Sequence, residues 1–332
     1  MKFGLPRKSW LTNARQNIFL LLGSVAVTLA LGEVAVRVAA AVMHREPIVM
    51  SDPNAGWANK PNLKNRKVIY GGGTFTLSTD ANGHRICYPI GQSPPVGFPN
   101  LLVVGDSFAE GISVNDDQTF PWMLARRTPY HVVNLGVVGY GTCQELVKLE
   151  EFFENHQQTK IQHIVILVCD NDFTDVQRSL EPYLGRHTPC FHIVNQTLVR
   201  PRYQLPVTDR LMDMSRLFWL VRSKLALLTV HDSPPPERGV DLVLACLGEM
   251  RRLSETRGAQ LHIFAHHHLW SKPIFPDSIW KRFLDQSGAI DMTDRLRASN
   301  EPDPVGTDGG HWSPAGNELV TEIIVKSLSA DR

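Results

Sequence analysis

The sequence has little of what marks several protein classes. It contains only five cysteines in 332 residues, scattered and without a Cys-x-x-Cys pair, which argues against a disulfide framework and a cysteine-based zinc site. Its formal net charge is only +1, and no long run of Lys or Arg occurs outside the extreme N-terminus. Nucleic acid is therefore not the expected partner. With 43% hydrophobic residues, the chain suits a globular domain with a large core.

The five cysteines fall into two groups. Cys143, Cys169 and Cys246 lie in or beside apolar segments, where cysteine usually serves as a small core residue. Cys87 and Cys190 lie in predicted loops and can pair in an oxidising compartment, which the sequence alone does not decide.

The N-terminal segment is apolar but not free of charge. Residues 1–16 are basic and contain no acid, and the uncharged stretch 18–32 is followed by Glu33 and Arg37. A bilayer core takes about 20 helical residues, so residues 17–43 span it only if these two side chains pair or reach the interface. We expect a transmembrane anchor over 17–43, with the basic end in the cytoplasm and the rest of the chain on the outer, periplasmic side.

Two other interpretations of this segment stay open. A cleavable signal peptide has an apolar core of about 7–15 residues ending in small residues, which the alanines at 39–41 supply. A buried globular helix is the third, but the segment stands outside the α/β pattern that follows. The anchor is favoured because the basic region is long and no clean cleavage pattern follows the apolar run directly.

Residues 44–98 form a polar lead-in that is rich in Gly, Pro and Asn turn signals. Between the turns, residues 67–70 and 74–78 are predicted to form short strands. The expectation is a spacer with a small hairpin packed on the main domain, rather than a substrate-binding element.

From residue 99 onward, apolar runs alternate with helical patterns. The runs predict buried strands at 101–104, 131–135, 161–168, 260–265 and 289–292. Helical spacing predicts helices after Thr119, over 142–156, 208–228 and 239–258, and from Ser313 onward. This alternation predicts an α/β fold with a mostly parallel five-stranded sheet covered by helices on both faces.

The helix predicted over 208–228 carries one apolar stripe, with Arg and Lys outside it. The stripe consists of Leu211, Met214, Leu217, Phe218, Val221 and Leu225. Such a stripe most often faces the core, and a lid over the substrate is the alternative.

Residues able to do chemistry follow the ends of the predicted strands. Ser107 lies in a sharp Gly-Asp-Ser turn just after 101–104, where open α/β sheets place their chemistry. Gly139 follows the second strand in a glycine-rich stretch, and Asn171 follows the third. A glycine lets the backbone approach a developing oxyanion closely, whereas Asn at a strand end is also an ordinary turn residue.

Asp308 and His311 lie three residues apart, just before a helix start at Ser313. A tight turn of this spacing lets the carboxylate meet the imidazole Nδ1–H. That bond fixes the tautomer and leaves Nε2 free to take a serine proton.

Four segments thus follow one another along the chain: those that contain Ser107, Gly139, Asn171 and the pair Asp308 and His311. In this order they resemble the four conserved sequence blocks of the SGNH (GDSL-type) hydrolases, a family of serine esterases and acyltransferases. The match covers about residue 99 to the end, and Gly56-Trp57 and residues 80–85 resemble the lead-in of the membrane-anchored bacterial type. The resemblance implies a three-layer, flavodoxin-like domain over 99–332. Cys169 stands where the family usually has glycine.

The resemblance also implies the roles of individual residues. Ser107, His311 and Asp308 are expected as the catalytic triad, and the amides of Ser107 and Gly139 with the Asn171 side chain as the oxyanion hole. An ester, on an envelope glycan or lipid-linked substrate, is the expected partner besides the membrane. No cofactor and no metal are expected.

Two other functions remain open at this stage. The same triad serves an O-acyltransferase to extracellular polysaccharide. A catalytically silent glycan-binding module is the other, with a sugar groove lined by Trp122, Tyr140, Trp312 and the histidines 266–268. These adjacent histidines point to opposite sides of an extended chain, which disfavours a metal site.

Overall fold

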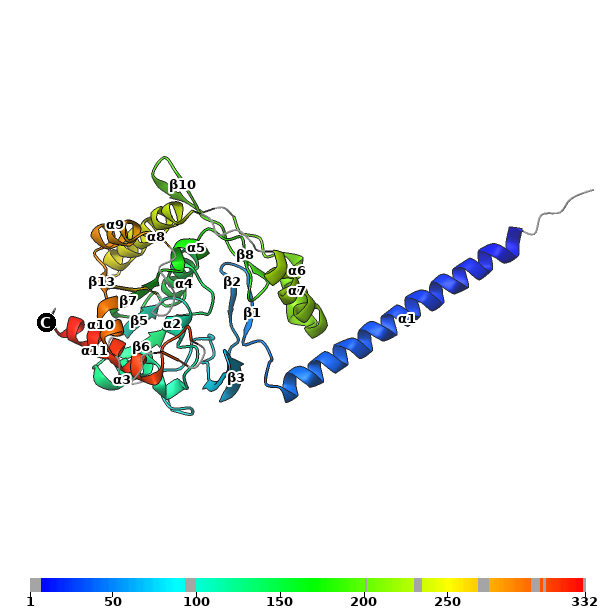
Figure 1. The fold of residues 1–332 in the computed structure, drawn as a ribbon, viewed down its shortest axis with the longest axis horizontal. Helices are drawn as coiled ribbons and strands as arrows, with labels where there is room; N and C mark the ends of the chain where they lie inside the picture. Colours follow the sequence, from blue (N-terminus) through cyan, green and yellow to red (C-terminus); the bar gives the residue numbers. More distant parts are fainter. Residues whose placement is uncertain are drawn as a thin grey trace, which may run out of the picture.

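The computed structural model describes residues 7–92, 100–200, 202–229, 235–267, 275–299, 305–306 and 309–330. Within these residues a sheet of five parallel strands forms the centre of the molecule (Figure 1). The strands are β5 (Asn100–Val104), β6 (His131–Asn134), β7 (Ile161–Cys169), β12 (Gln260–His266) and β13 (Ile290–Asp291). Their spatial order is β13-β12-β7-β5-β6. Counted along the chain this is the order 2-1-3-4-5 of flavodoxin-like folds, so the predicted fold class is confirmed.

Helices cover both faces of this sheet. One layer contains α4 (Thr142–Asn155), α8 (Pro236–Thr256) and α9 (Asp277–Ser287), and the other contains α3 (Phe120–Arg127), α10 (Thr293–Ala298) and α11 (Pro314–Ala330). Successive residues of β5 face opposite layers, because side chains alternate along a strand. Leu102 and Val104 pack in the first layer, and Leu101 and Val103 in the second. Burying one such side chain contributes about 1.5–3 kcal/mol.

The lead-in folds into two antiparallel hairpins. They are β1 (Val49–Asp52) with β2 (Gly56–Asn59), and β3 (Arg66–Tyr70) with β4 (Gly73–Leu77). The two short strands predicted here are thus confirmed to within one residue. A lone hairpin is marginally stable, and these two are held by burying Trp57, Phe75 and Leu77.

Short elements that the apolar pattern does not reveal fill the connections. They are α2 (Ser107–Glu110), a 3₁₀ turn at Asp116–Gln118, α5 (Asp172–Asp175), β8 (Leu180–Glu181), β9 (Arg186–His187), β10 (His192–Val194) and β11 (Thr197–Val199). Helix α2 follows β5 and helix α5 follows β7, both at the carboxyl edge of the sheet.

The helix predicted over 208–228 is two helices, α6 (Val207–Met214) and α7 (Arg216–Thr229). The Ser215 hydroxyl accepts a hydrogen bond from the Phe218 N–H at 3.0 Å and so caps a new helix. The expectation of a core-facing stripe is wrong. Met214, Val221 and Leu225 are exposed, because α6 and α7 stand at the side of the body that faces the N-terminal helix (Figure 1).

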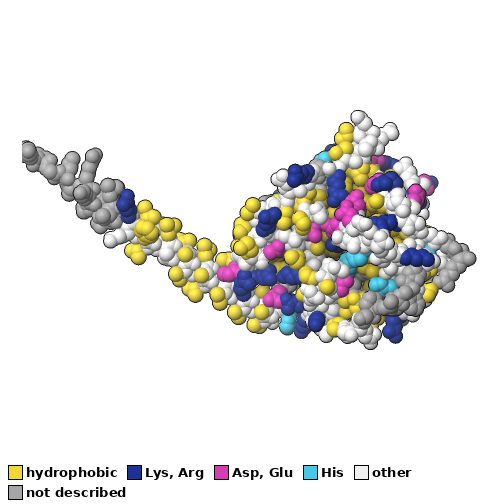
Figure 2. Space-filling view, turned by 180° about the vertical axis from the view of Figure 1, so that it is seen from behind, with side chains coloured by type: hydrophobic (Ala, Val, Ile, Leu, Met, Phe, Trp, Pro, Cys, Tyr) yellow, Lys and Arg dark blue, Asp and Glu magenta, His cyan; other side chains and the backbone are white. Residues whose placement is uncertain are grey.

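The N-terminal helix, α1 (Arg7–Val42), projects from the body and carries hydrophobic side chains along the part of it whose side chains are described (Figure 2). Its segment from Arg15 to Val42 is long and apolar enough to cross a membrane. A signal sequence has the same properties, so α1 is a candidate anchor or signal sequence.

All five cysteines are free thiols. The Sγ atoms of Cys87 and Cys190 lie against different backbone carbonyls, those of Arg85 and of Arg178 and Thr188. The bond left open between these two cysteines is therefore not formed in this structure.

Candidate active site

The turn after β5 presents Ser107 at the carboxyl edge of the sheet. The Asp106 carboxylate accepts a hydrogen bond from the Phe108 N–H at 2.9 Å and caps α2, so Ser107 is the first residue of that helix. A side chain at Gly105 would place its Cβ 2.8 Å from the Cβ of Ala109, which explains why glycine occupies this position. Ser107 thus lies between β5 and β7, where the strand order reverses and such folds bind ligands.

His311 reaches this serine from the far end of the chain. Its Nε2 lies 2.8 Å from the Ser107 Oγ, a hydrogen-bonding distance. The residues that follow Ser107 and His311 also pack together, since the ring centroids of Phe108 and Trp312 lie 4.9 Å apart. The predicted contact between Ser107 and His311 is therefore present. Asp308, the predicted acid of the triad, lies outside the described residues.

The loop that carries His311 is closed by its own backbone. The N–H of Gly306 donates to the carbonyl of His311 at 2.7 Å, and Gly309 takes a positive φ of 68° in the turn between them. The Ser313 hydroxyl accepts from the Gly316 N–H and starts α11, as predicted. Because Trp312 is buried, this loop holds the imidazole in place beside α2.

Asn171 lies beside Asp106 of the Gly-Asp-Ser turn, close to the serine that its predicted oxyanion role would serve. Its Nδ2 donates to the carboxylates of Asp106 at 3.2 Å and Asp175 at 2.8 Å, while its Oδ1 is buried without a hydrogen-bond partner. Burial raises the pKa of Asp175 to about 6, although Arg178 opposes the shift. An oxyanion bound by Asn171 would therefore compete with carboxylates for the amide hydrogens.

Gly139 occupies a narrow place in the loop after β6. Its φ is +77°, and an added Cβ would lie 3.3–3.5 Å from side-chain atoms of Glu181, Leu184 and Trp57. The positive φ and the close approach of these three side chains together favour glycine at position 139. The indole N–H of Trp57 donates to the carbonyl of Val138 at 2.9 Å, so the lead-in holds this loop directly.

Arg85, also in the lead-in, is fully buried and contacts the C-terminal end of α2. Its guanidinium pairs with Asp116 at 2.9 Å and donates to the carbonyls of Glu110, Gly111, Val114 and Thr76. These carbonyls include those that end the helix carrying Ser107. Sequence reasoning recognised the segment that contains Arg85 but missed this role. The available signal in the sequence was a positively charged residue, Arg85, within a stretch of turn-forming residues.

Glu110, at the end of α2, is buried and links that helix to the Gly139 loop. Its carboxylate accepts a hydrogen bond from the Val138 N–H, and the Asn59 side chain is a further polar neighbour. Burial raises the pKa of Glu110 to about 7, against the opposing effect of Arg85. The loop contact is thus made by an acid that changes charge near neutral pH.

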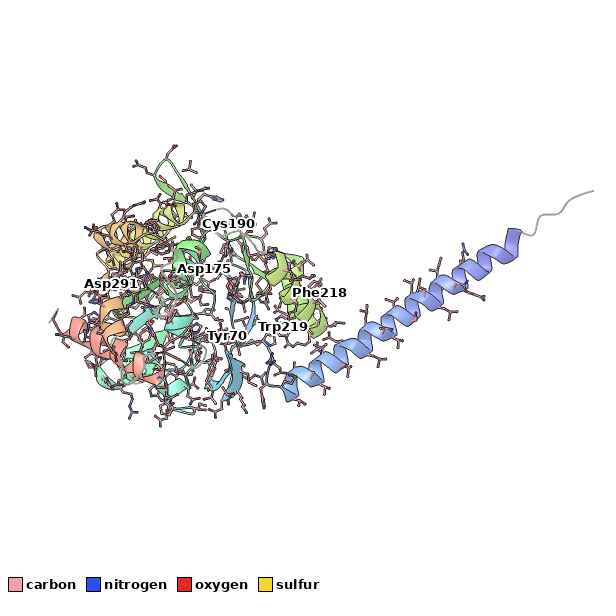
Figure 3. All side chains as sticks on the ribbon, viewed as in Figure 1. Tyr70, Asp175, Cys190, Phe218, Trp219 and Asp291 are labelled. Atoms are coloured by element: carbon pink, nitrogen blue, oxygen red, sulfur yellow. The ribbon has the colours of Figure 1, made fainter. Side chains whose placement is uncertain are left out.

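Tyr70, at the tip of the β3–β4 hairpin, is a further neighbour of the site. Its ring and that of His311 meet edge to face with centroids 5.5 Å apart, and Tyr70 keeps 42% of its surface exposed. Figure 3 labels it on the side of the lead-in that faces the body. No sequence pattern indicated this contact. The expectation that the hairpin packs on the main domain holds, and the hairpin also reaches His311.

Most of the residues assigned to a sugar groove are buried instead. Tyr140, Trp312 and His266 are buried, and Trp122 is half-buried. His267 is also buried, with its Nδ1 3.1 Å from the Asp170 carboxylate. His268 lies outside the described residues. The buried members therefore offer no open surface for a glycan.

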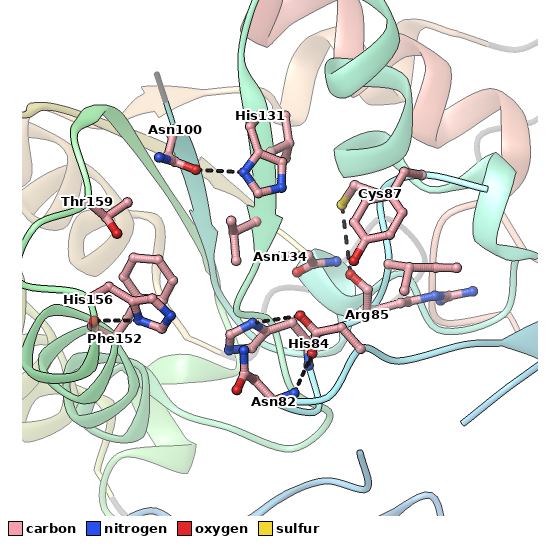
Figure 4. A pocket seen from close by; sticks show the side chains of 15 residues that line it. Asn82, His84, Arg85, Cys87, Asn100, His131, Asn134, Phe152, His156 and Thr159 are labelled. Atoms are coloured by element: carbon pink, nitrogen blue, oxygen red, sulfur yellow. Dashed lines mark hydrogen bonds and ion pairs between the residues drawn. The ribbon is translucent and has the colours of Figure 1, made fainter. Parts of the chain in front are cut away.

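A cavity of about 350 Å³ lies between the lead-in, β6 and α4, and Figure 4 shows it from close by. His84, His131 and His156 line it, together with Asp80, whose carboxylate lies 3.4 Å from His84 Nδ1. Neither Ser107 nor His311 lines this cavity. It is therefore a feature separate from the candidate active site.

No protein-family model and no curated protein matches the chain. Solved structures do match. AlinE4, an SGNH-hydrolase family esterase, is 14% identical over 73% of this chain and 98% of its own, with a TM-score of 0.36. LAE5, an α/β hydrolase enzyme from the metagenome of Lake Arreo, Spain, is 13% identical over 69% and 94%, with a TM-score of 0.37. A carbohydrate esterase family 2 enzyme with a carbohydrate-binding domain, from Corynascus thermopiles, is 11% identical over 75% and 70%, with a TM-score of 0.34.

Proposed function

We propose that this chain is a serine ester hydrolase of the SGNH type. The observation that carries the proposal is the 2.8 Å contact between Ser107 Oγ and His311 Nε2 at the carboxyl edge of the sheet. A serine at hydrogen-bond distance from an imidazole is the arrangement that activates a hydroxyl as a nucleophile. Asp308 completes the triad in this proposal, by orienting the imidazole and stabilising its protonated form.

The reaction proceeds through a serine ester. Ser107 Oγ attacks the ester carbonyl while His311 Nε2 accepts the hydroxyl proton, and the same proton then passes to the leaving alcohol. Water, deprotonated by His311, next attacks the serine ester, and the bond to Ser107 Oγ breaks as His311 returns the proton to that oxygen, which releases the acid and restores the serine. The amides of Ser107 and Gly139 and the Asn171 side chain are the proposed donors to the oxyanion in both steps.

The proposed substrate is an O-acyl group on an envelope glycan or lipid-linked molecule. This rests on α1, which we propose anchors the chain by a single N-terminal helix with the catalytic domain on the outer side. Tyr70 supports an extended substrate, because it exposes an aromatic surface beside His311. If a sugar hydroxyl replaces water in the second step, the same site is an O-acyltransferase. Acetyl groups found on a glycan rather than as free acetate would identify the transferase.

The test is ester hydrolysis by variants of two serines. Ser107→Ala should lower the rate with p-nitrophenyl acetate by roughly 10⁴-fold or more, because the nucleophile is lost. Ser329→Ala is the matched control, since that exposed hydroxyl bonds only to a carbonyl within α11. Undiminished hydrolysis by Ser107→Ala would contradict the mechanism.

A further inference from the structure

Helices α6 and α7 present an apolar surface to solvent on the side of the body that α1 meets. The side chains of Met214, Val221, Leu225 and Leu228 are 72%, 49%, 51% and 66% exposed. Figure 2 shows hydrophobic side chains of α1 running up to the body, with Lys and Arg side chains near the junction. A contiguous apolar surface of this kind marks a site of interaction rather than ordinary surface.

Glu33 and Arg37, the two charged residues in the second half of α1, contact these helices. The Glu33 carboxylate accepts hydrogen bonds from the N–H groups of Arg216 at 2.9 Å and Leu217 at 3.0 Å, and from the Ser215 hydroxyl at 2.7 Å. It thereby caps α7 from another helix, where the free N–H groups and the helix dipole favour an anion. Arg37 binds Glu33 and donates to the carbonyl of Met214, the last residue of α6, at 2.7 Å.

The contacts of Glu33 and Arg37 determine the level along α1, and so the depth relative to the membrane, at which α6 and α7 meet it. The uncharged stretch 18–32 has 15 residues and is about 22 Å long as a helix. A hydrocarbon core of about 30 Å therefore extends roughly five residues further, past Glu33 to about Arg37. The junction of α6 and α7 lies at that level, at the outer boundary of the hydrocarbon.

A groove of about 380 Å³ runs between the two elements. Val36 and Ala39 of α1, Met43 just after it, and Trp219, Leu220 and Leu227 of α7 line it, with Arg45, Lys224 and Tyr183 among its other residues. Figure 3 labels Phe218 and Trp219 on this helix beside α1. Apolar walls with basic and tyrosine side chains match a phospholipid, whose acyl chains are apolar and whose phosphate is anionic.

We propose that α6 and α7 lie in the headgroup layer of the outer leaflet beside α1, and that phospholipid, with its phosphate and the adjoining part of its acyl chains, occupies both the groove and the exposed apolar surface. The proposal rests on the anchoring of α1. It has a consequence for the site, because Ser223 of α7 packs against Gly185 while Leu184 packs against Gly139. Embedding α7 therefore holds the Gly139 loop toward the membrane and orients the site toward substrates at its surface.

Photolabelling of the full chain in lipid vesicles tests this. The vesicles contain phosphatidylcholine, phosphatidylglycerol and a small fraction of phospholipid with a diazirine at the glycerol end of its acyl chain, and labelled peptides are mapped by mass spectrometry. We expect label on α1 and on α7, with α7 at least several-fold above the β10–β11 hairpin. That hairpin is the matched control, because Val194 and Val199 are also exposed and it projects from another part of the body (Figure 1).

The outcomes separate the inference from the anchoring on which it depends. If α1 is labelled but the label on α7 is no higher than that on the hairpin, the inference is overturned and the anchor stands. The same result is expected if a second copy of the chain, rather than lipid, covers α7. Absence of label from both helices would overturn the anchor as well. In the variant carrying Val221→Glu and Leu225→Glu, label on α7 should fall at least threefold while hydrolysis of p-nitrophenyl acetate is kept. Unchanged label on α7 in that variant would contradict the assigned surface.

Discussion

The loops at the strand ends and the lead-in make different contributions to one site. The loops of the α/β body supply the groups that would do the chemistry: Ser107 and Asn171 follow strands β5 and β7, and His311 lies in the loop before α11. The lead-in supplies none of them, yet Arg85 and Trp57 hold the backbone that positions them. The comparison teaches that the site depends on a segment whose sequence looks like a spacer. Changes in the lead-in should therefore alter stability and substrate binding, and changes at the strand ends should alter the rate of chemistry.

The largest effect expected from the lead-in is on stability. Arg85→Met should lower the free energy of unfolding by roughly 3–5 kcal/mol, because it leaves Asp116 and several carbonyls buried without their donor. Thermal or denaturant unfolding of the full chain measures this. Arg127→Met is the control, since its partly exposed pair with Glu318 contributes at most about 1 kcal/mol. Equal losses in the two variants would remove the special role of Arg85.

At the strand ends, the expected effect is on the rate. Asn171→Ala should lower kcat with p-nitrophenyl acetate by roughly 100-fold to 1000-fold with little change in KM, as the loss of one oxyanion donor does. Asn82→Ala, in an exposed turn of the lead-in, should leave kcat unchanged. A kcat for Asn171→Ala within a few-fold of the parent would mean that its amide serves only Asp106 and Asp175.

Glu110 connects the two regions and should make stability depend on pH. Because its folded pKa of about 7 lies above the unfolded value of 4.5, folding takes up a proton between these values. The stability that the protonated form contributes is present below pH 4.5 and is lost as the pH rises to 7, about 3 kcal/mol in all. Glu110→Gln removes this loss, so its stability relative to the parent should rise over that range. A difference that does not change with pH would contradict the assignment.

The smallest effect is expected at Tyr70. Tyr70→Ala should raise KM for an acylated oligosaccharide by roughly threefold to tenfold, the equivalent of about 0.5–1.5 kcal/mol from a lost aromatic contact. The rate with p-nitrophenyl acetate should stay the same, and Tyr70→Phe should behave like the parent because the ring is kept. A loss of equal size with both substrates would assign Tyr70 to the positioning of His311 instead.

The sequence predicted the sheet well, because continuous apolar runs such as 164–168 leave few alternatives to a buried strand. It also predicted that Ser107 and His311 meet, through the order of the blocks. It did not predict the exposed face of α7, since a stripe of apolar residues has the same sequence pattern whether it packs in the core or stays exposed. Nor did it predict Tyr70, Trp57 or Arg85 as parts of the site, because these contacts join positions far apart in the chain and leave no local pattern.

The central claim is that His311 activates Ser107, and labelling by a fluorophosphonate tests it most directly. The account predicts a single phosphonyl adduct on Ser107, found by mass spectrometry, and labelling at least 100-fold slower in His311→Ala than in a His192→Ala control from the β10–β11 hairpin. Labelling of another serine, or equal rates in the two histidine variants, would contradict it.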